Sequence, residues 1–221
     1  MNSKSRSSRR ESARRKEQQG PASRWLLPVA GLAILAVALI AVVLSQGAAG
    51  DAPSSVPATA PTITGDSLPT FTDTIGDVAK GLVAPVVQGH DYQGDPVEIA
   101  PNGQPTLVIF AAHWCSYCQQ EIPIIQDWID AGRAPADVDL VSVSTAIDPK
   151  APNYPPEAWL AREGWTVPIV VDPTSTVGKA YGLSSYPFFV VLDGSGKVFA
   201  RFAGKIPASD LEKILASVPR S

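Results

Sequence analysis

Two apolar runs joined by an amphipathic segment restrict the folds open to this chain. The first run, Thr106–Phe110, contains no charged residue and is typical of a strand that is covered on both faces. The second run, Val138–Val143, is nearly as apolar. The segment between them predicts a helix from Cys115 to about Ala131, because isoleucines recur there at helical spacing: Ile122, Ile125 and Ile129. A strand, a helix and a strand in this order predict a right-handed βαβ unit with parallel strands.

Short apolar runs, turn residues and helical patterns alternate through the rest of this region. We expect a β-hairpin at 85–99, with its turn at 92–95, before the central strand. A proline-rich loop at 145–156 follows the βαβ unit. The later expected elements are a helix at 157–162, a strand at 168–171, a helix at 174–181, a hairpin of strands 187–192 and 197–202, and a last helix at 207–216. This order predicts an α/β fold.

The chain has two cysteines, which lie three positions apart where the first strand meets the helix. Cys115 is expected at the amino terminus of the helix, where unpaired N–H groups and the helix dipole stabilise a thiolate. Cys118 is expected one turn later, within reach to resolve a mixed disulfide. The pair therefore predicts a redox-active dithiol. Two alternatives stay open: a passive structural disulfide, and a metal site that adds His113 and His90 as ligands.

Residues 106–123, TLVIFAAHWCSYCQQEIP, resemble the active-site segment of the thioredoxin-fold superfamily. The pattern Trp-Cys-x-x-Cys-x-x-Glu-x-Pro is most similar to the TlpA-like branch of membrane-anchored thiol-disulfide oxidoreductases. The similarity extends from about Pro85 to Leu215 and includes SSYPFFVVLDGSGKV near the end. The resemblance implies a thioredoxin fold with an N-terminal β-hairpin extension and a dithiol that exchanges with protein partners.

Several residues around the cysteines have expected roles, and the resemblance implies those of Pro187 and Glu121. Pro187 matches the family's cis-proline, which would face the disulfide, and an ordinary trans proline of an edge strand is the alternative. Glu121 matches an acidic residue that tunes the thiols and shuttles protons, and a solvated helix glutamate is the alternative. His113 is a candidate to stabilise the Cys115 thiolate or to accept its proton. Three aromatic residues are expected to modulate the site by covering the disulfide or setting its exposure: Trp114, Tyr117 and Tyr186.

Two features depart from the family pattern. The dipeptide between the cysteines is Ser116-Tyr117 rather than Gly-Pro, and because this dipeptide tunes the thiolate, the direction of electron flow stays open. Phe188-Phe189 after the proline makes the neighbouring groove more apolar.

The loop at 145–156 is expected to overhang the site, since it follows the carboxyl end of a parallel strand. We hypothesise that this loop selects the partner protein.

The amino-terminal part of the chain differs in composition. Residues 25–44 contain no ionisable side chain and are long enough to cross the roughly 30 Å hydrocarbon core of a bilayer as a helix. Residues 1–24 hold eight of the 18 basic and two of the 21 acidic residues, so the positive-inside rule predicts a cytoplasmic amino terminus. Residues 45–70 are rich in Pro, Ala, Ser and Thr and predict a disordered linker before an extracytoplasmic domain at 71–221. A cleaved signal peptide is the alternative to a signal anchor.

These features predict a single-pass protein of the cell membrane whose catalytic domain is an extracytoplasmic thiol-disulfide oxidoreductase. After residue 24 the chain holds ten basic and nineteen acidic residues, a net charge of −9, which argues against nucleic acid as a partner. The expected partners are protein thiols and disulfides and a membrane electron donor or acceptor. No metal, nucleotide, flavin or haem cofactor is expected. A thiol peroxidase, whose pattern needs a threonine at Ala112, and a copper or haem-pathway binding module are the alternatives.

Overall fold

The computed structural model describes residues 59–219. The predicted basic tail (1–24), the predicted membrane span (25–44) and most of the predicted linker (45–70) lie outside these residues. Within 59–219, no helix combines the length and the apolar character needed to cross a membrane.

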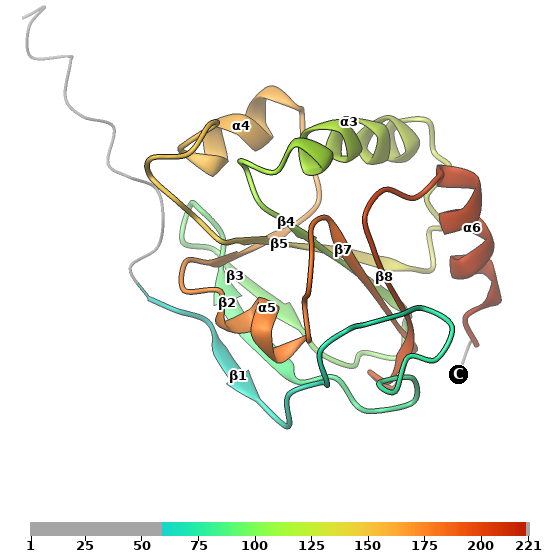
Figure 1. Ribbon diagram of the computed structural model, residues 1–221. Coiled ribbons are helices and arrows are strands. Elements are labelled where there is room, and N and C mark those ends of the chain that lie inside the picture. Colours follow the sequence, from blue (N-terminus) through green and yellow to red (C-terminus); the bar gives the residue numbers. More distant parts are fainter. Residues whose placement is uncertain (1–58, 220–221) are drawn as a thin grey trace, which may run out of the picture. The chain divides into compact units, whose positions relative to one another are not determined.

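A five-stranded sheet with the order β6-β5-β4-β7-β8 forms the centre of the described residues (Figure 1). Its strands are β4 (Thr106–Ala111), β5 (Asp139–Thr145), β6 (Ile169–Asp172), β7 (Phe188–Leu192) and β8 (Val198–Ala203). β4 is parallel to β5 and antiparallel to β7, while β5 is parallel to β6 and β7 is antiparallel to β8. Every residue of β4 is buried, so the predicted βαβ unit with a strand covered on both faces is confirmed.

Two hydrophobic clusters fill the two sides of this sheet. Side chains alternate along β4, so that Leu107 and Ile109 join one cluster and Val108 and Phe110 join the other. The helices are α3 (Ser116–Asp130), α4 (Pro156–Arg162), α5 (Thr176–Ala180) and α6 (Ala208–Ser217). α3 and α6 pack on the first side and α5 on the second, as Figure 1 shows. The predicted α/β architecture is confirmed, with helix ends shifted by one or two residues.

A second, antiparallel sheet of order β1-β2-β3 packs on the same side as α5. β2 (Val86–His90) and β3 (Pro96–Ile99) form the predicted hairpin. β1 (Thr62–Thr64) pairs with β2 although it belongs to the segment 45–70, so the prediction of a disordered linker is wrong for the end of that segment. The physical reason is that backbone hydrogen bonds to its neighbour hold an edge strand, so it needs few large apolar side chains. The β-branched residues of β1 also favour the extended conformation of a strand.

The segment after β1 also packs on the domain. Leu68 is buried, and its N–H donates to the Ala180 carbonyl at the end of α5 over 2.8 Å. Gly182 follows α5 with a φ of 71°, and a Cβ there would lie 2.2 Å from the Pro69 carbonyl oxygen. Glycine is therefore required, for conformation and for space, where this segment crosses the end of α5.

Candidate active site

The carboxyl end of β4 leads into α3, and the two cysteines lie at this junction. Cys115 is the N-cap residue of α3, and its Sγ accepts a hydrogen bond from the Cys118 N–H at 3.3 Å. The carboxyl ends of the parallel strands β5 and β6 reach the same edge, and the antiparallel strand β7 begins there. The predicted place of Cys115 is confirmed, and its sulfur lies where the unpaired N–H groups of the helix favour an anion.

The two thiols differ in their access to solvent. Cys115 is 8% exposed, whereas Cys118 is fully buried, and both are free. Burial raises the pKa of the Cys118 thiol, because the low-dielectric interior disfavours a thiolate. Cys118 is therefore held as a protonated thiol, and a protein disulfide from solution cannot contact it before it contacts Cys115. Only Cys115 is placed to meet a disulfide that arrives from solution.

Pro187 lies directly before β7, beside the end of β4. The Tyr186–Pro187 peptide bond is cis, as the resemblance implies, and the alternative of a trans proline is wrong. The next residue, Phe188, pairs with Phe110 near the end of β4, which places the proline at the edge that carries the cysteines. The Pro187 carbonyl accepts from the Gly204 N–H at 2.8 Å, so its own backbone is tied to the segment after β8.

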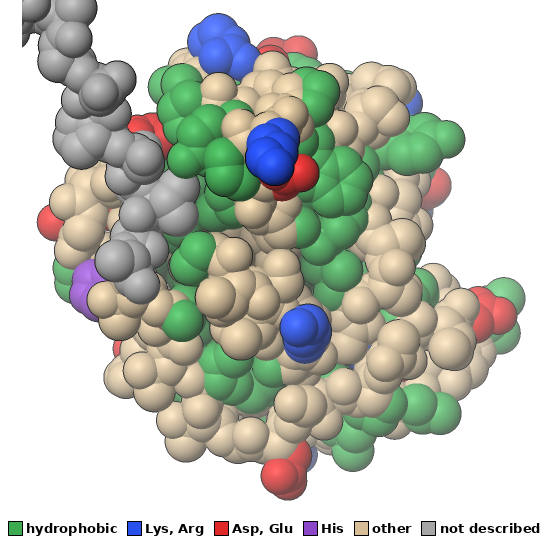
Figure 2. All heavy atoms as spheres, turned by 60° about the vertical axis from the view of Figure 1, so that its left-hand side comes forward, with side chains coloured by type: hydrophobic (Ala, Val, Ile, Leu, Met, Phe, Trp, Pro, Cys, Tyr) green, Lys and Arg blue, Asp and Glu red, His purple; other side chains and the backbone are tan. Residues whose placement is uncertain are grey.

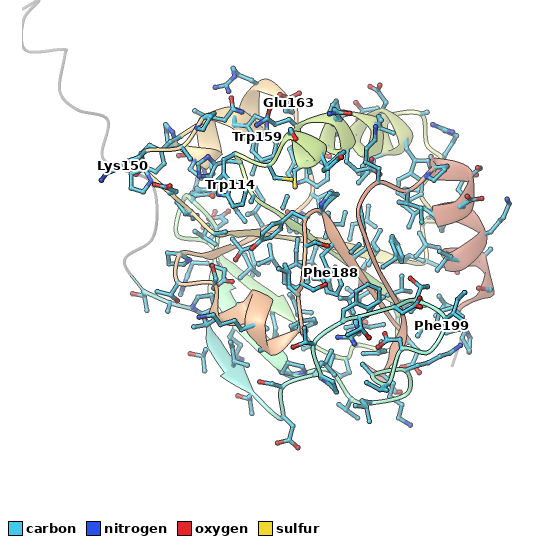
Figure 3. The ribbon with its side chains drawn as sticks, viewed as in Figure 1. Trp114, Lys150, Trp159, Glu163, Phe188 and Phe199 are labelled. Carbon is cyan, nitrogen blue, oxygen red and sulfur yellow. The ribbon has the colours of Figure 1, made fainter. Side chains whose placement is uncertain are left out.

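Aromatic side chains surround the cysteines, and two of them are open to solvent. Trp114 is 39% exposed and Tyr117 is 58% exposed. The Trp114 ring lies edge-on to Tyr186 at a centroid distance of 5.8 Å. Burial raises the pKa of Tyr186, and the two nearby cysteine sulfurs contribute in the same direction. Figure 3 labels Trp114 on the left-hand side of the molecule, and Figure 2, which turns that side toward the reader, shows hydrophobic side chains gathered there with charged ones among them.

Glu121 lies one helical turn after Cys118, and its side chain is buried. The residue is 1% exposed, so the alternative of a solvated helix glutamate is wrong. Its Oε1 accepts from the Ile206 N–H at 3.0 Å. Burial raises the pKa of the Glu121 carboxyl, while the Ile206 N–H and the charge of Lys205 act in the opposite direction. The site thus contains a carboxyl group that takes up a proton more readily than one in water.

His113 is fully buried, and its ring bonds to a loop rather than to a cysteine. Its Nδ1 donates to the Pro152 carbonyl at 2.7 Å, and its Nε2 accepts from the Asp148 N–H at 3.2 Å. Both ring nitrogens are therefore used by backbone groups of the loop after β5. This corrects the expectation that His113 stabilises the Cys115 thiolate or accepts its proton.

The proposed metal ligands do not come together. His90 lies exposed at the end of β2, while His113 uses both ring nitrogens for the loop. Among residues 59–219, no three His, Cys, Asp or Glu side chains gather in an arrangement that could hold a metal ion.

Sequence reasoning missed buried polar groups at the ends of β5 and β6. The Thr145 hydroxyl donates to Asp172 at 2.9 Å, and Asp172 also accepts from the N–H groups of Thr176 and Gly178. Both residues end parallel strands at the same edge as Cys115, and that position was the available signal. Asp172 is completely buried but bonded on both oxygens, so it anchors α5 to the sheet.

The Redoxin family matches this chain over residues 63–215. The thiol-disulfide oxidoreductase ResA of Geobacillus kaustophilus (strain HTA426) is 24% identical over 144 residues, which cover 65% of this chain and 78% of that protein. The sporulation thiol-disulfide oxidoreductase A of Bacillus subtilis (strain 168) is 28% identical over 122 residues, 55% and 72% of the two chains.

A similar fold is found in the crystal structure of StoA from Bacillus subtilis, with a TM-score of 0.52 and 25% identity over 61% of this chain and 98% of that one. The family match spans more than half of the sequence and contains the Cys115–Cys118 junction, the five-stranded sheet and α3. On this ground the chain belongs to the Redoxin family and has its thioredoxin-like fold.

Proposed function

We propose that this chain is a membrane-anchored, extracytoplasmic enzyme that exchanges its Cys115–Cys118 dithiol with disulfides of protein partners. That the chain is a thiol-disulfide oxidoreductase rests on its family and on its relatives. The observation that carries the proposed mechanism is the inequality of the two thiols. Cys115 caps α3 and is 8% exposed, whereas Cys118 is fully buried one turn later.

The proposed exchange has two displacements. The Cys115 thiolate attacks one sulfur of the partner's disulfide, forms a mixed disulfide and releases the other sulfur as a thiolate. Cys118 then loses its proton, attacks the Cys115 sulfur and releases the partner's second thiol. The partner gains two electrons and two protons, and the chain keeps a Cys115–Cys118 disulfide, which a thiol donor reduces again. The same steps in reverse oxidise a partner.

Neighbouring residues are proposed to support these steps. Glu121 is one turn from Cys118, and its raised pKa suits it to receive the proton that Cys118 releases. Pro187 and the aromatic side chains of Trp114, Tyr117 and Tyr186 surround the sulfurs and offer an apolar surface to the partner.

The sequence of the amino-terminal part supports the proposed location. An uncharged span at 25–44 that follows a basic segment favours a membrane anchor with the domain on the outer side. A membrane protein that donates or accepts electrons is the proposed second partner, because an anchored domain meets such a protein at high local concentration.

Trapping of mixed disulfides tests the mechanism. Cys118→Ser leaves Cys115 without a resolving thiol, so mixed disulfides with other proteins, which a reductant cleaves, are expected to accumulate. Cys115→Ser is the matched control and is expected to trap nothing, since its remaining thiol is buried. Adducts in the control but not in Cys118→Ser would reverse the two roles. Two thiols that react equally slowly with an alkylating reagent would refute the enzyme.

A further inference from the structure

A short loop, residues 146–153, lies at the same sheet edge as Cys115, and one side chain holds two parts of it. His113 donates from Nδ1 to the Pro152 carbonyl at 2.7 Å and accepts at Nε2 from the Asp148 N–H at 3.2 Å. The ring is fully buried. Because a carbonyl only accepts and a backbone N–H only donates, these two bonds require the neutral tautomer with its proton on Nδ1.

The backbone of His113 connects the same loop to the helix that carries the cysteines. Its carbonyl accepts from the Asn153 side chain at 3.2 Å and from the Gln119 side chain at 3.0 Å. Gln119 is in the first turn of α3. The loop and the helix therefore meet at one residue, two positions before Cys115.

The loop does not rest in a relaxed conformation. Ala146 and Asn153 have φ values of 51° and 61°, in the left-handed region that costs free energy for residues other than glycine. External contacts must offset this cost. The His113 ring supplies such contacts at Asp148 and at Pro152, and the Trp114 indole N–H donates to the Ala146 carbonyl at 2.7 Å at the start of the loop.

The inner side of the loop forms a wall of the site and is apolar. Ala146 and Ile147 pack against the cluster that contains both cysteines and Ile122. The charged residues of the loop, Asp148 and Lys150, are exposed. Figure 3 shows Lys150 at the outer tip of the loop, away from Trp114. A polypeptide that approaches Cys115 along this wall meets aliphatic and aromatic side chains rather than charges.

We propose that His113 is a positioning residue that holds the loop 146–153 as one wall of the substrate groove, and that this wall selects partner segments with an apolar residue beside their cysteine. This inference rests on the proposed function and adds a substrate class to it. His113 acts through the loop and takes no part in the transfer of electrons or protons.

Two kinds of disulfide with the same leaving group distinguish the contribution of the loop 146–153 to substrate binding from the reactivity of Cys115. The first is the symmetrical disulfide of thionitrobenzoic acid, which is small. The second is a short peptide whose cysteine is joined to thionitrobenzoate, with either leucine or aspartate on both sides of the cysteine. In each case the Cys115 thiolate of the reduced protein forms a new S–S bond, the old S–S bond breaks, and coloured thionitrobenzoate leaves with the electron pair. Single-turnover absorbance gives the saturation constant and the limiting rate separately.

The native full chain is expected to prefer the leucine peptide to the aspartate peptide by about ten-fold in its saturation constant. His113→Ala is expected to remove that preference by weakening leucine-peptide binding about ten-fold, while the rate with the small disulfide stays within about two-fold. His113→Asn is expected to recover part of the preference, because its amide can still donate to the Pro152 carbonyl. His90→Ala is the matched control, since His90 is the other histidine and lies exposed on β2.

Each outcome decides one claim. If the small disulfide does not react with the native full chain, the proposed function fails. If it reacts but the native full chain shows no peptide preference, or if His113→Ala slows both kinds of disulfide equally, the inference about the wall fails and the enzyme stands. Should His113→Ala not fold, Ile147→Ser alters the half-buried wall directly and is expected to weaken the leucine peptide alone.

Discussion

Glu121 shows how burial changes the chemistry of a single residue. Its carboxyl group lies out of water on α3, with the Ile206 N–H as its hydrogen-bond donor. Cys118, one turn earlier, is equally shielded, and burial raises the pKa of both groups for the same reason. The Cys118 thiol must transfer its proton to an acceptor before it can attack. The Glu121 carboxylate is the proposed acceptor, because it lies on the same face of the helix.

Glu121→Gln tests this role. The amide can still accept from the Ile206 N–H but cannot take a proton, so release of a mixed disulfide at neutral pH is expected to slow by roughly a hundred-fold, the low end for a positioned proton acceptor. The attack by Cys115 on a small disulfide is expected to be unchanged. Rapid-quench measurement of mixed-disulfide decay checks this, and an unchanged decay would remove Glu121 from the mechanism.

The same variant carries a stability prediction with a definite sign. Because burial raises the pKa of Glu121 above its ordinary value of 4.5, the folded state binds more protons than the unfolded state just above that pH. The free energy of unfolding is therefore expected to fall as pH rises from 4.5 through the raised pKa, and to level off beyond it. Glu121→Gln is expected to flatten this slope, which urea unfolding over a pH series measures.

At the scale of elements, the segment 65–83 is held onto the central sheet by a few specific contacts. The buried Arg201 side chain on β8 bonds through Nε to Asp77 at 2.8 Å and through Nη1 to the Pro69 carbonyl at 2.8 Å. The guanidinium lowers the pKa of Asp77 by a hydrogen-bonded ion pair. Stability from this pair is fully present above the ordinary value of 3.8 and is lost as pH falls through the lowered pKa.

Asp77→Asn is expected to cost about 3 kcal/mol of the free energy of unfolding, because it leaves the buried Arg201 charge without its partner. Asp73→Asn is a matched control. Both aspartates accept a backbone N–H two residues later, but only Asp77 also meets an arginine. Urea titrations of the two variants give the comparison, and equal losses would mean that the turn rather than the ion pair matters.

The crossing of this segment over the end of α5 gives a second prediction. Gly182 and Gly132 have φ values of 71° and 65°, so alanine is strained by a similar amount at each. A Cβ at Gly182 would meet the Pro69 carbonyl, whereas one at Gly132 has no heavy atom within 4 Å. Gly132→Ala is expected to cost about 1 kcal/mol and Gly182→Ala at least about 2 kcal/mol more. Thermal or urea unfolding of the two variants measures both losses. Their difference gives the cost of the contact with the Pro69 carbonyl, apart from the backbone strain that the two positions share.

For the whole molecule, the proposed arrangement is a basic tail, a span at 25–44 and an exchange domain outside the cytoplasm. After a membrane-impermeant phosphine has reduced any Cys115–Cys118 disulfide, a membrane-impermeant maleimide added to intact cells is expected to label Cys115 in the full chain. In a Cys115→Ser, Cys118→Ser background, Ser7→Cys is expected to stay unlabelled until the cells are lysed. Labelling of Ser7→Cys in intact cells would reverse the proposed orientation, and the absence of labelling at Cys115 would place the domain inside.

The sequence by itself determined the elements and the place of the dithiol, because these depend on neighbours in the chain. The apolar runs of β4 and β5, the isoleucine spacing of α3 and the cysteine spacing each involve residues within a few positions. From them followed the βαβ unit and a cysteine at a helix amino terminus.

Only the tertiary structure decided what depends on partners far apart in sequence. Glu121 meets Ile206, 85 residues away, and His113 meets Pro152, 39 residues away, so the burial of one and the loop contact of the other had no local signal. The composition of residues 45–70 predicts a linker where β1 lies, because the edge position of β1 is supported by the backbone of β2 rather than by its own apolar content. Local hydrogen bonding and periodicity set the elements, but burial and partner choice arise only when the layers pack.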